Sequence, residues 1–133
     1  MSSPQAIAID RVLAPIHIMP VVVLEDIDHA VPLADALLEG GIGAMELTLR
    51  TSAGLPAAEK IAKTRPEMII GTGTVLTPDD MIRSVEAGAQ FAVSPGLTSP
   101  LAEAARSYFD SCPLLPGTAT ASDIMAGLEW GFE

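Results

Sequence analysis

The chain has 133 residues, of which 49% are hydrophobic and only 18% charged, so its composition excludes a disordered protein and predicts one core of ordinary size. Its formal net charge of −10 argues against nucleic acid or an anionic membrane surface as the main partner. Without a signal peptide, a membrane-length apolar run or a second cysteine beside Cys112, we expect a cytoplasmic protein with no internal disulfide.

Short apolar runs alternate with longer amphipathic runs five times along the chain, after an N-terminal helix predicted within residues 1–14. The predicted strands, in chain order, are Ile16–Val23, Ala44–Leu49, Met68–Gly71, Gln90–Val93 and Pro113–Leu115. The predicted helices that follow them begin near Asp28, Gly54, Thr77, Ser99 and Ser122. Pro20, in the first predicted strand, has no backbone N–H, so it must lie where no hydrogen bond is donated to a neighbouring strand.

This repeat predicts parallel strands joined by crossover helices, in either an open doubly wound sheet or a closed barrel. Short strands and connections of similar length favour a (β/α)8 TIM barrel, with residues 1–133 forming a single, partial domain. Eight such units need roughly 180 to 200 residues, and a five-unit piece exposes two strand edges. We therefore expect the chain to be part of a longer protein.

The second predicted strand carries polar side chains on one face. Side chains alternate along a strand, so Glu46, Thr48 and Arg50 share the face that would point into the barrel. A carboxyl group in a partly dry interior has a raised pKa, as a general acid–base requires, and a nearby guanidinium suits a substrate carboxylate. An internal Glu46–Arg50 ion pair that only fills the barrel stays open as the alternative.

Glycine-rich or proline-containing turns follow the later strands at the same end of the predicted barrel. In the first of these turns, glycines let a ligand approach the backbone and Thr74 offers a hydroxyl, although a tight strand-to-helix turn also explains them. Pro95 lies in a second turn that ordinary turn chemistry explains equally well. The histidines His17 and His29 and the cysteine have no metal-ligand spacing, so we expect no metal.

Taken together, these segments resemble the 2-keto-3-deoxy-6-phosphogluconate (KDPG) and 4-hydroxy-2-oxoglutarate (KHG) aldolase family, in the family's order and spacing. The resembling stretches are residues 20–23, 30–34, 46–51, 71–76, 88–91, 94–98 and 113–117. The resemblance implies a class I aldolase of the (β/α)8-barrel type that works without a metal or other cofactor. A lysine would form a Schiff base with the keto carbon of the substrate before the C3–C4 bond breaks.

The resemblance also implies substrates and residue roles. KDPG would give pyruvate and glyceraldehyde 3-phosphate, and KHG would give pyruvate and glyoxylate. By position, Glu46 matches the acid–base residue, Arg50 and Thr74 match residues that hold the pyruvyl carboxylate, and Pro95 matches a pocket residue. A homotrimer acting in carbohydrate metabolism (the Entner–Doudoroff pathway) is further implied.

The chain departs from the family pattern in its lysines. Lys60 and Lys63, its only two, are predicted on a helix outside the barrel, so we expect the Schiff-base lysine just after Glu133 and no activity from a chain that ends there. Open alternatives are a non-catalytic fragment or scaffold, and a 2-keto-3-deoxy-6-phosphogalactonate aldolase. A thiamine-phosphate-synthase relative is a weaker alternative, because the strand with Glu46 and Arg50 speaks against it.

Overall fold

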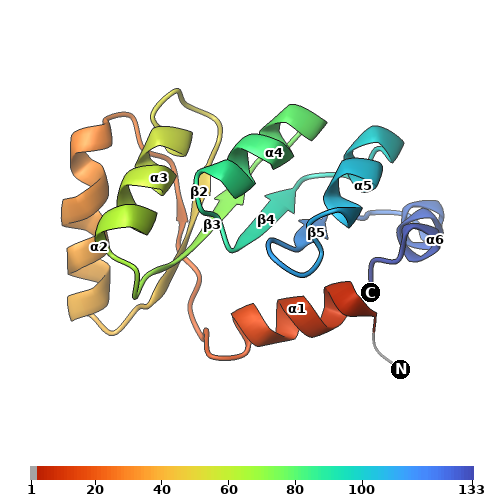
Figure 1. Cartoon of the computed structure of the whole chain (residues 1–133), viewed down its shortest axis with the longest axis horizontal. Coiled ribbons are helices and arrows are strands. Elements are labelled where there is room, and N and C mark those ends of the chain that lie inside the picture. Colours follow the sequence, from red (N-terminus) through yellow and green to blue (C-terminus); the bar gives the residue numbers. More distant parts are fainter. Residues whose placement is uncertain (1–2) are drawn as a thin grey trace.

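The structure, a computed structural model, describes residues 3–133, in which strands and helices alternate (Figure 1). The strands are β1 (Val21–Val22), β2 (Ala44–Thr48), β3 (Ile69–Gly73), β4 (Phe91–Ser94) and β5 (Leu114–Pro116). The helices are α1 (Pro4–Leu13), the 3-10 helix η1 (Ile27–His29), α2 (Ala30–Glu39), α3 (Gly54–Thr64), α4 (Pro78–Glu86), α5 (Ser99–Arg106) and α6 (Ala121–Trp130). The expected alternation of strands and helices is confirmed. Residues 1–2 of the expected N-terminal segment lie outside the described residues.

The strands form one parallel sheet in the order β1-β2-β3-β4-β5, so each strand pairs with the one before it. A doubly wound sheet reverses its strand order at a switch point, whereas a barrel adds strands in one direction. Figure 1 shows α2 to α5 in a row along one side of the sheet, with α1 on the other side. This order is the one predicted for consecutive units of a barrel.

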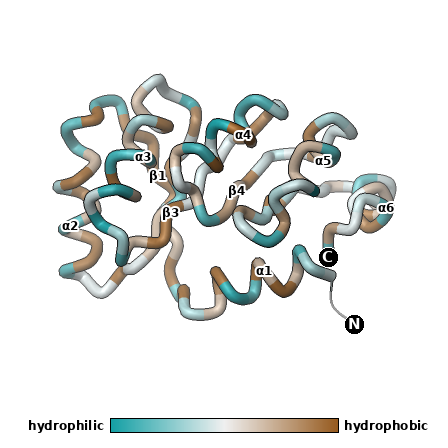
Figure 2. Tube along the Cα trace, viewed as in Figure 1, coloured by the Kyte–Doolittle hydropathy of each residue, from teal (hydrophilic) through white to brown (hydrophobic). Residues whose placement is uncertain are grey.

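Two apolar clusters lie between the sheet and its helices. The first joins Met45 and Leu47 of β2 to buried alanines of α2 and α3, and the second joins Ala92 of β4 and Leu114 of β5 to α4 and α5. Figure 2 shows apolar and polar segments alternating along α2, α3 and α4, as expected for helices with one buried face. The face of the sheet that contacts α2 to α5 is the outward face of the predicted barrel, and apolar packing closes it. The opposite, inward face is left for the site.

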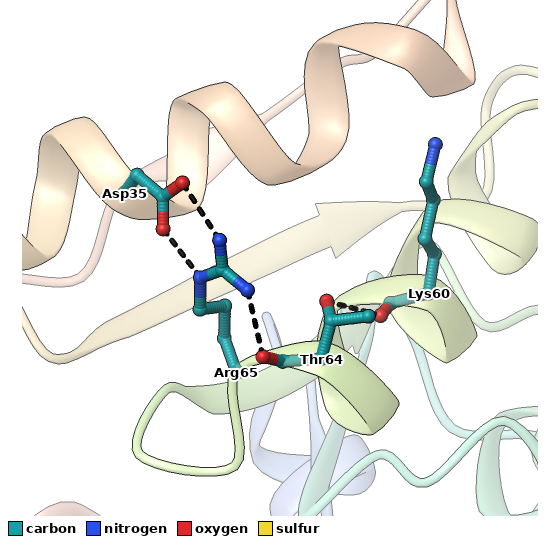
Figure 3. Close-up of polar contacts among 4 residues, drawn as sticks. All are labelled: Asp35, Lys60, Thr64 and Arg65. Carbon is teal, nitrogen blue, oxygen red and sulfur yellow. Dashed lines mark hydrogen bonds and ion pairs between the residues drawn. The ribbon is translucent and has the colours of Figure 1, made fainter.

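Arg65, at the C-terminal end of α3, fixes that helix against α2. Its Nε and Nη2 atoms donate to the two carboxylate oxygens of Asp35, the second over 2.9 Å, while Nη1 donates to the carbonyl of Thr64 over 2.8 Å (Figure 3). This two-pronged contact holds the Asp35 pKa below its ordinary value, mainly through the hydrogen bond from Arg65. The helix pair beside β2 is thus linked by charge as well as by apolar packing.

The first strand and the helix after it are shorter than the sequence predicts. Instead of Ile16–Val23, only Val21 and Val22 form strand, because Pro20 has no N–H and contributes only its carbonyl, which accepts from Glu46 N over 2.9 Å. The helix expected from Asp28 begins at Ala30, after η1. An earlier start would require an N–H donor at Pro32, which has none. Among the described residues, no helix is long and apolar enough to cross a membrane.

Gly54 generates a testable prediction because α3 begins directly against the end of β2. A Cβ at position 54 would collide with the backbone carbonyl of Thr48. We expect Gly54→Ala to lower the free energy of unfolding by about 1–3 kcal/mol, the usual cost of overpacking, in urea denaturation of the natural protein that carries this sequence. Gly96→Ala is the matched control, since a Cβ there meets nothing within 4 Å. Equal losses in the two variants would show that the close approach at Gly54 does not matter.

Candidate active site

Glu46 lies in the middle of β2 on the inward face of the sheet. Its neighbours Met45 and Leu47 are fully buried on the outward face, whereas Glu46 itself is half-buried. In the parallel register, Glu46 pairs with Gly71 and Thr48 pairs with Gly73. The predicted alternation of β2 therefore places the Glu46 carboxyl group beside two glycines of the next strand.

Those glycines leave room for two large inward-facing side chains. A Cβ at Gly73 would take the place of the Glu46 carboxyl group, and a Cβ at Gly71 would run into the ring of Phe91. The sequence suggested that these glycines admit a ligand to the backbone or form a tight turn. In the structure they are strand residues that let Glu46 and Phe91 lie across β3.

The hollow around Glu46 is largely apolar and has a volume of about 370 Å³. Its lining residues are Leu13, Ile16, His17, Met19, Glu46, Phe91, Val93 and Leu115. Burial in these surroundings raises the pKa of Glu46, and the positive charge of Arg50 offsets part of that rise. A carboxyl group with a raised pKa keeps its proton to a higher pH than an ordinary glutamate does, which suits acid–base chemistry.

Arg50 and Thr74 meet at the ends of β2 and β3. Arg50 Nε donates a hydrogen bond to Thr74 Oγ1 over 3.2 Å. Thr74 has a φ of 62°, and among described residues other than glycine only Thr74 lies in the left-handed region. That conformation costs a β-branched residue about 1–2 kcal/mol, so the neighbouring structure must hold it in place. The contact leaves the terminal nitrogens of Arg50 to bind an anion.

No direct ion pair joins Glu46 to Arg50 within the described part of the chain. The internal Glu46–Arg50 pair that the sequence left open is therefore not formed, and Arg50 acts on Glu46 only through space. Such a pair would hold the carboxyl group ionised, whereas its absence lets burial dominate the pKa.

Pro95 lies at the same edge of the sheet but lines another hollow. It is exposed, follows β4, and borders a depression of about 490 Å³ together with Leu76 and Asp123. Its backbone carbonyl lies where a Cβ of Gly117 would be, so the turns after β4 and β5 touch each other. The structure thus brings Arg50 and Thr74 into contact at the ends of β2 and β3, whereas Arg50 and Pro95 each line a hollow other than the one around Glu46.

Sequence reasoning missed Phe91 and His17 as neighbours of the hollow around Glu46. The inward position of Phe91 follows from the alternation along β4, since it pairs with Gly71, opposite Glu46. His17 could not be found in this way, because the segment before Pro20 is not a strand.

The remaining candidates for chemistry lie elsewhere. Lys60 and Lys63 both lie on α3; Lys60 Nζ is 3.6 Å from Asp28, and Lys63 pairs with Glu59. Figure 3 shows Lys60 in the helix layer, near the contact between α2 and α3. Within residues 3–133, no three His, Cys, Asp or Glu side chains are grouped so as to hold a metal ion.

Comparisons of the sequence with known proteins all match one family. A family model described as KDPG and KHG aldolase matches residues 9–133. The KHG/KDPG aldolase of Escherichia coli K12 is 47% identical over 116 residues, which cover 87% of this chain and 54% of that protein. The 2-dehydro-3-deoxy-phosphogluconate aldolase of Zymomonas mobilis is 45% identical over 125 residues, covering 94% and 59%. The chain thus spans little more than half the length of these relatives.

Solved structures agree with this match. KDPG aldolase from Legionella pneumophila, with pyruvate captured at low pH as a covalent carbinolamine intermediate, superimposes with a TM-score of 0.85 at 40% identity, over 98% of this chain and 60% of that one. The Zymomonas mobilis enzyme with 3-phosphoglycerate gives a TM-score of 0.84 at 44% identity, over 93% and 58%. The predicted (β/α)8-barrel fold class is confirmed.

The raised pKa of Glu46 predicts how stability depends on pH. Its pKa is higher in the folded state, so the Glu46 contribution is fully present below the unfolded-state pKa and is lost as pH rises through the folded-state pKa. Glu46→Gln stays neutral, so its stability relative to the parent should increase over that pH interval and then level off. Urea denaturation at a series of pH values measures the difference, with Glu25→Gln, at an exposed position, as the control. A difference that shrinks as pH rises would contradict the burial of the carboxyl group.

Proposed function

Because this chain belongs to the KDPG and KHG aldolase family, we propose that it supplies the acid–base and carboxylate-binding part of the active site of such an aldolase. The substrates would be KDPG, KHG or both. The observation that carries the proposal is the half-buried Glu46, whose pKa burial raises, within range of the positive charge of Arg50, which itself contacts Thr74. A proton-transfer group and an anion-binding group within one site are what cleavage of a hydroxylated keto acid requires.

In the proposed reaction, a lysine expected just after Glu133 forms a Schiff base with the keto carbon. Removal of the C4 hydroxyl proton lets that oxygen become a carbonyl while the C3–C4 bond breaks and its electrons move onto the iminium nitrogen. The aldehyde leaves, C3 takes up a proton, and water hydrolyses the imine to release pyruvate. Glu46 would accept the first proton and return one to C3, through a water molecule.

Arg50 and Thr74 would hold the carboxylate end of the substrate. Because Nε of this exposed arginine is occupied by Thr74, its terminal nitrogens are the ones that can meet a carboxylate. The strained backbone of Thr74 supports this reading, since strain is often retained where it orients a functional group. Pro95 would line the pocket farther along the same edge.

We further propose a single barrel domain, preceded by the N-terminal helix, that acts as a cytoplasmic homotrimer in carbohydrate metabolism. A chain limited to residues 1–133 would be inactive, since both of its lysines lie on α3. Assignment as a KDPG aldolase rather than a 2-keto-3-deoxy-6-phosphogalactonate aldolase is supported by identities of 40% and 44% to solved KDPG aldolases, against 26% to a solved KDPGal structure.

Glu46→Gln in the natural protein that carries this sequence tests the assignment. Cleavage of KDPG should fall by about 10²–10⁴-fold, the usual contribution of a positioned acid–base group. Borohydride should still trap pyruvate on the protein, because the nucleophile is a separate lysine. Activity is measured from pyruvate release, and trapping from intact mass.

Glu39→Gln removes an exposed carboxylate at the C-terminal end of α2 and should leave both measurements unchanged. A trapped adduct on Lys60 or Lys63 would contradict the proposed nucleophile. Full cleavage activity in Glu46→Gln would contradict the proposed role of Glu46.

A further inference from the structure

Gln5 is a polar residue of α1 that is almost completely buried, with 1% of its surface exposed. Its Nε2 donates to the backbone carbonyl of Leu114 over 2.9 Å, and its Oε1 accepts from the backbone N–H of Glu133 over 3.2 Å. Both ends of one side-chain amide therefore contact segments more than one hundred residues away. A buried amide whose nitrogen and oxygen are both hydrogen-bonded is a specific contact, because losing either partner would leave a buried polar atom unpaired.

The carbonyl of Leu114 lies on the side of β5 opposite β4. β5 contacts β4 through the carbonyl of Pro113, which accepts from Ala92, and through the N–H of Gly117, which donates to Ser94. Alternate residues of a parallel strand bond to opposite neighbours, so the Leu114 carbonyl points away from β4. Gln5 occupies this edge position, at which no strand pairs among the described residues.

Glu133 follows a short anchored segment after α6. Gly131 has a φ of +89°, and the buried ring of Phe132 packs edge-on against Phe109 with centroids 5.1 Å apart. The side chain of Phe132 thus anchors this segment, and the backbone N–H of Glu133 donates to Gln5.

Glu133 makes a second contact with α1, at the start of that helix. The backbone N–H of Ser3 donates to a carboxylate oxygen of Glu133 over 2.8 Å, and the Ser3 side chain caps the helix by accepting from Ala6. Figure 1 shows the start of α1 next to the C-terminal residue. Helix α1, the edge of β5 and the segment after α6 therefore meet at Gln5.

We propose that Gln5 is a positioning residue that fixes the backbone at Glu133 against β5 and so sets the direction in which the chain leaves α6. The step from this contact to catalysis rests on the proposed function, in which the nucleophilic lysine follows Glu133. Loss of the Gln5 contacts turns that backbone without disturbing Glu46, Arg50 and Thr74, which lie on β2 and after β3. Imine formation then slows while the carboxylate is bound as before.

The test uses Gln5→Met in the natural protein that carries this sequence, a change that keeps the length of the side chain and removes both hydrogen bonds. Asp10→Asn, at an exposed position of the same helix, is the matched control. Hydrogen exchange at the Glu133 amide should become about tenfold faster in Gln5→Met, a factor that corresponds to about 1.4 kcal/mol, and stay unchanged in the control. Exchange within β2 and β3 should not change.

The functional measurement is the rate of borohydride trapping across pyruvate concentrations. Gln5→Met should lower the maximal first-order rate constant of trapping about tenfold and leave the half-saturating pyruvate concentration and the final extent of trapping unchanged. A smaller fraction of folded protein would instead lower the final extent of trapping. Gln5→Asn keeps a neutral amide on a side chain one methylene shorter, so it should protect the Glu133 amide less than the parent residue and more than Gln5→Met does. It also keeps the proposal testable if Gln5→Met fails to fold.

Unchanged exchange at Glu133 in both Gln5 variants would overturn the contact itself. Faster exchange with an unchanged maximal trapping rate would overturn the positioning role. If the parent protein traps no pyruvate, the proposed function fails, and the exchange measurement still decides whether Gln5 holds Glu133.

Discussion

The position of the Glu46 carboxyl group over Gly73 is the constraint on which the rest of the site depends. A strand in the middle of a parallel sheet has apolar neighbours on both sides, and an ionised group there is costly unless space and charge are arranged for it. The missing side chain at Gly73 supplies the space, while Arg50 supplies a distant positive charge that does not neutralise Glu46 completely. The result is a carboxyl group whose pKa is raised by burial, with the charge of Arg50 offsetting part of the rise.

The surrounding fold keeps this arrangement rigid. The outward face of the sheet is closed by alanine-rich helices, so β2 cannot rotate to release Glu46. At the end of β3, Thr74 has a strained backbone conformation and also accepts the hydrogen bond from Arg50. Strain held beside a polar contact fits the anion-binding role proposed for Arg50, because a fixed guanidinium loses little freedom on binding a carboxylate.

The sequence was sufficient to predict features that depend on short-range patterns. The alternation in Glu46, Thr48 and Arg50 predicted the inward face of β2, and the motif spacing predicted a family that the comparisons confirm. Contacts between distant segments could not be predicted. The collision between a Cβ at position 73 and the Glu46 carboxyl group depends on the register of β2 with β3, which the sequence alone does not give. Gln5 is the extreme case, since its partners lie more than one hundred residues away and nothing near it in sequence indicates burial.

A titration of the Glu46 carboxyl group by NMR, in the natural protein that carries this sequence and in its Gly73→Ala variant, tests the account most directly. We predict a pKa above the ordinary glutamate value in the parent, because burial outweighs the charge of Arg50. In the variant the added methyl group takes the place of the carboxyl group, so the pKa should fall toward the ordinary value. A parent pKa at or below the ordinary value, or one that Gly73→Ala leaves unchanged, would contradict the account.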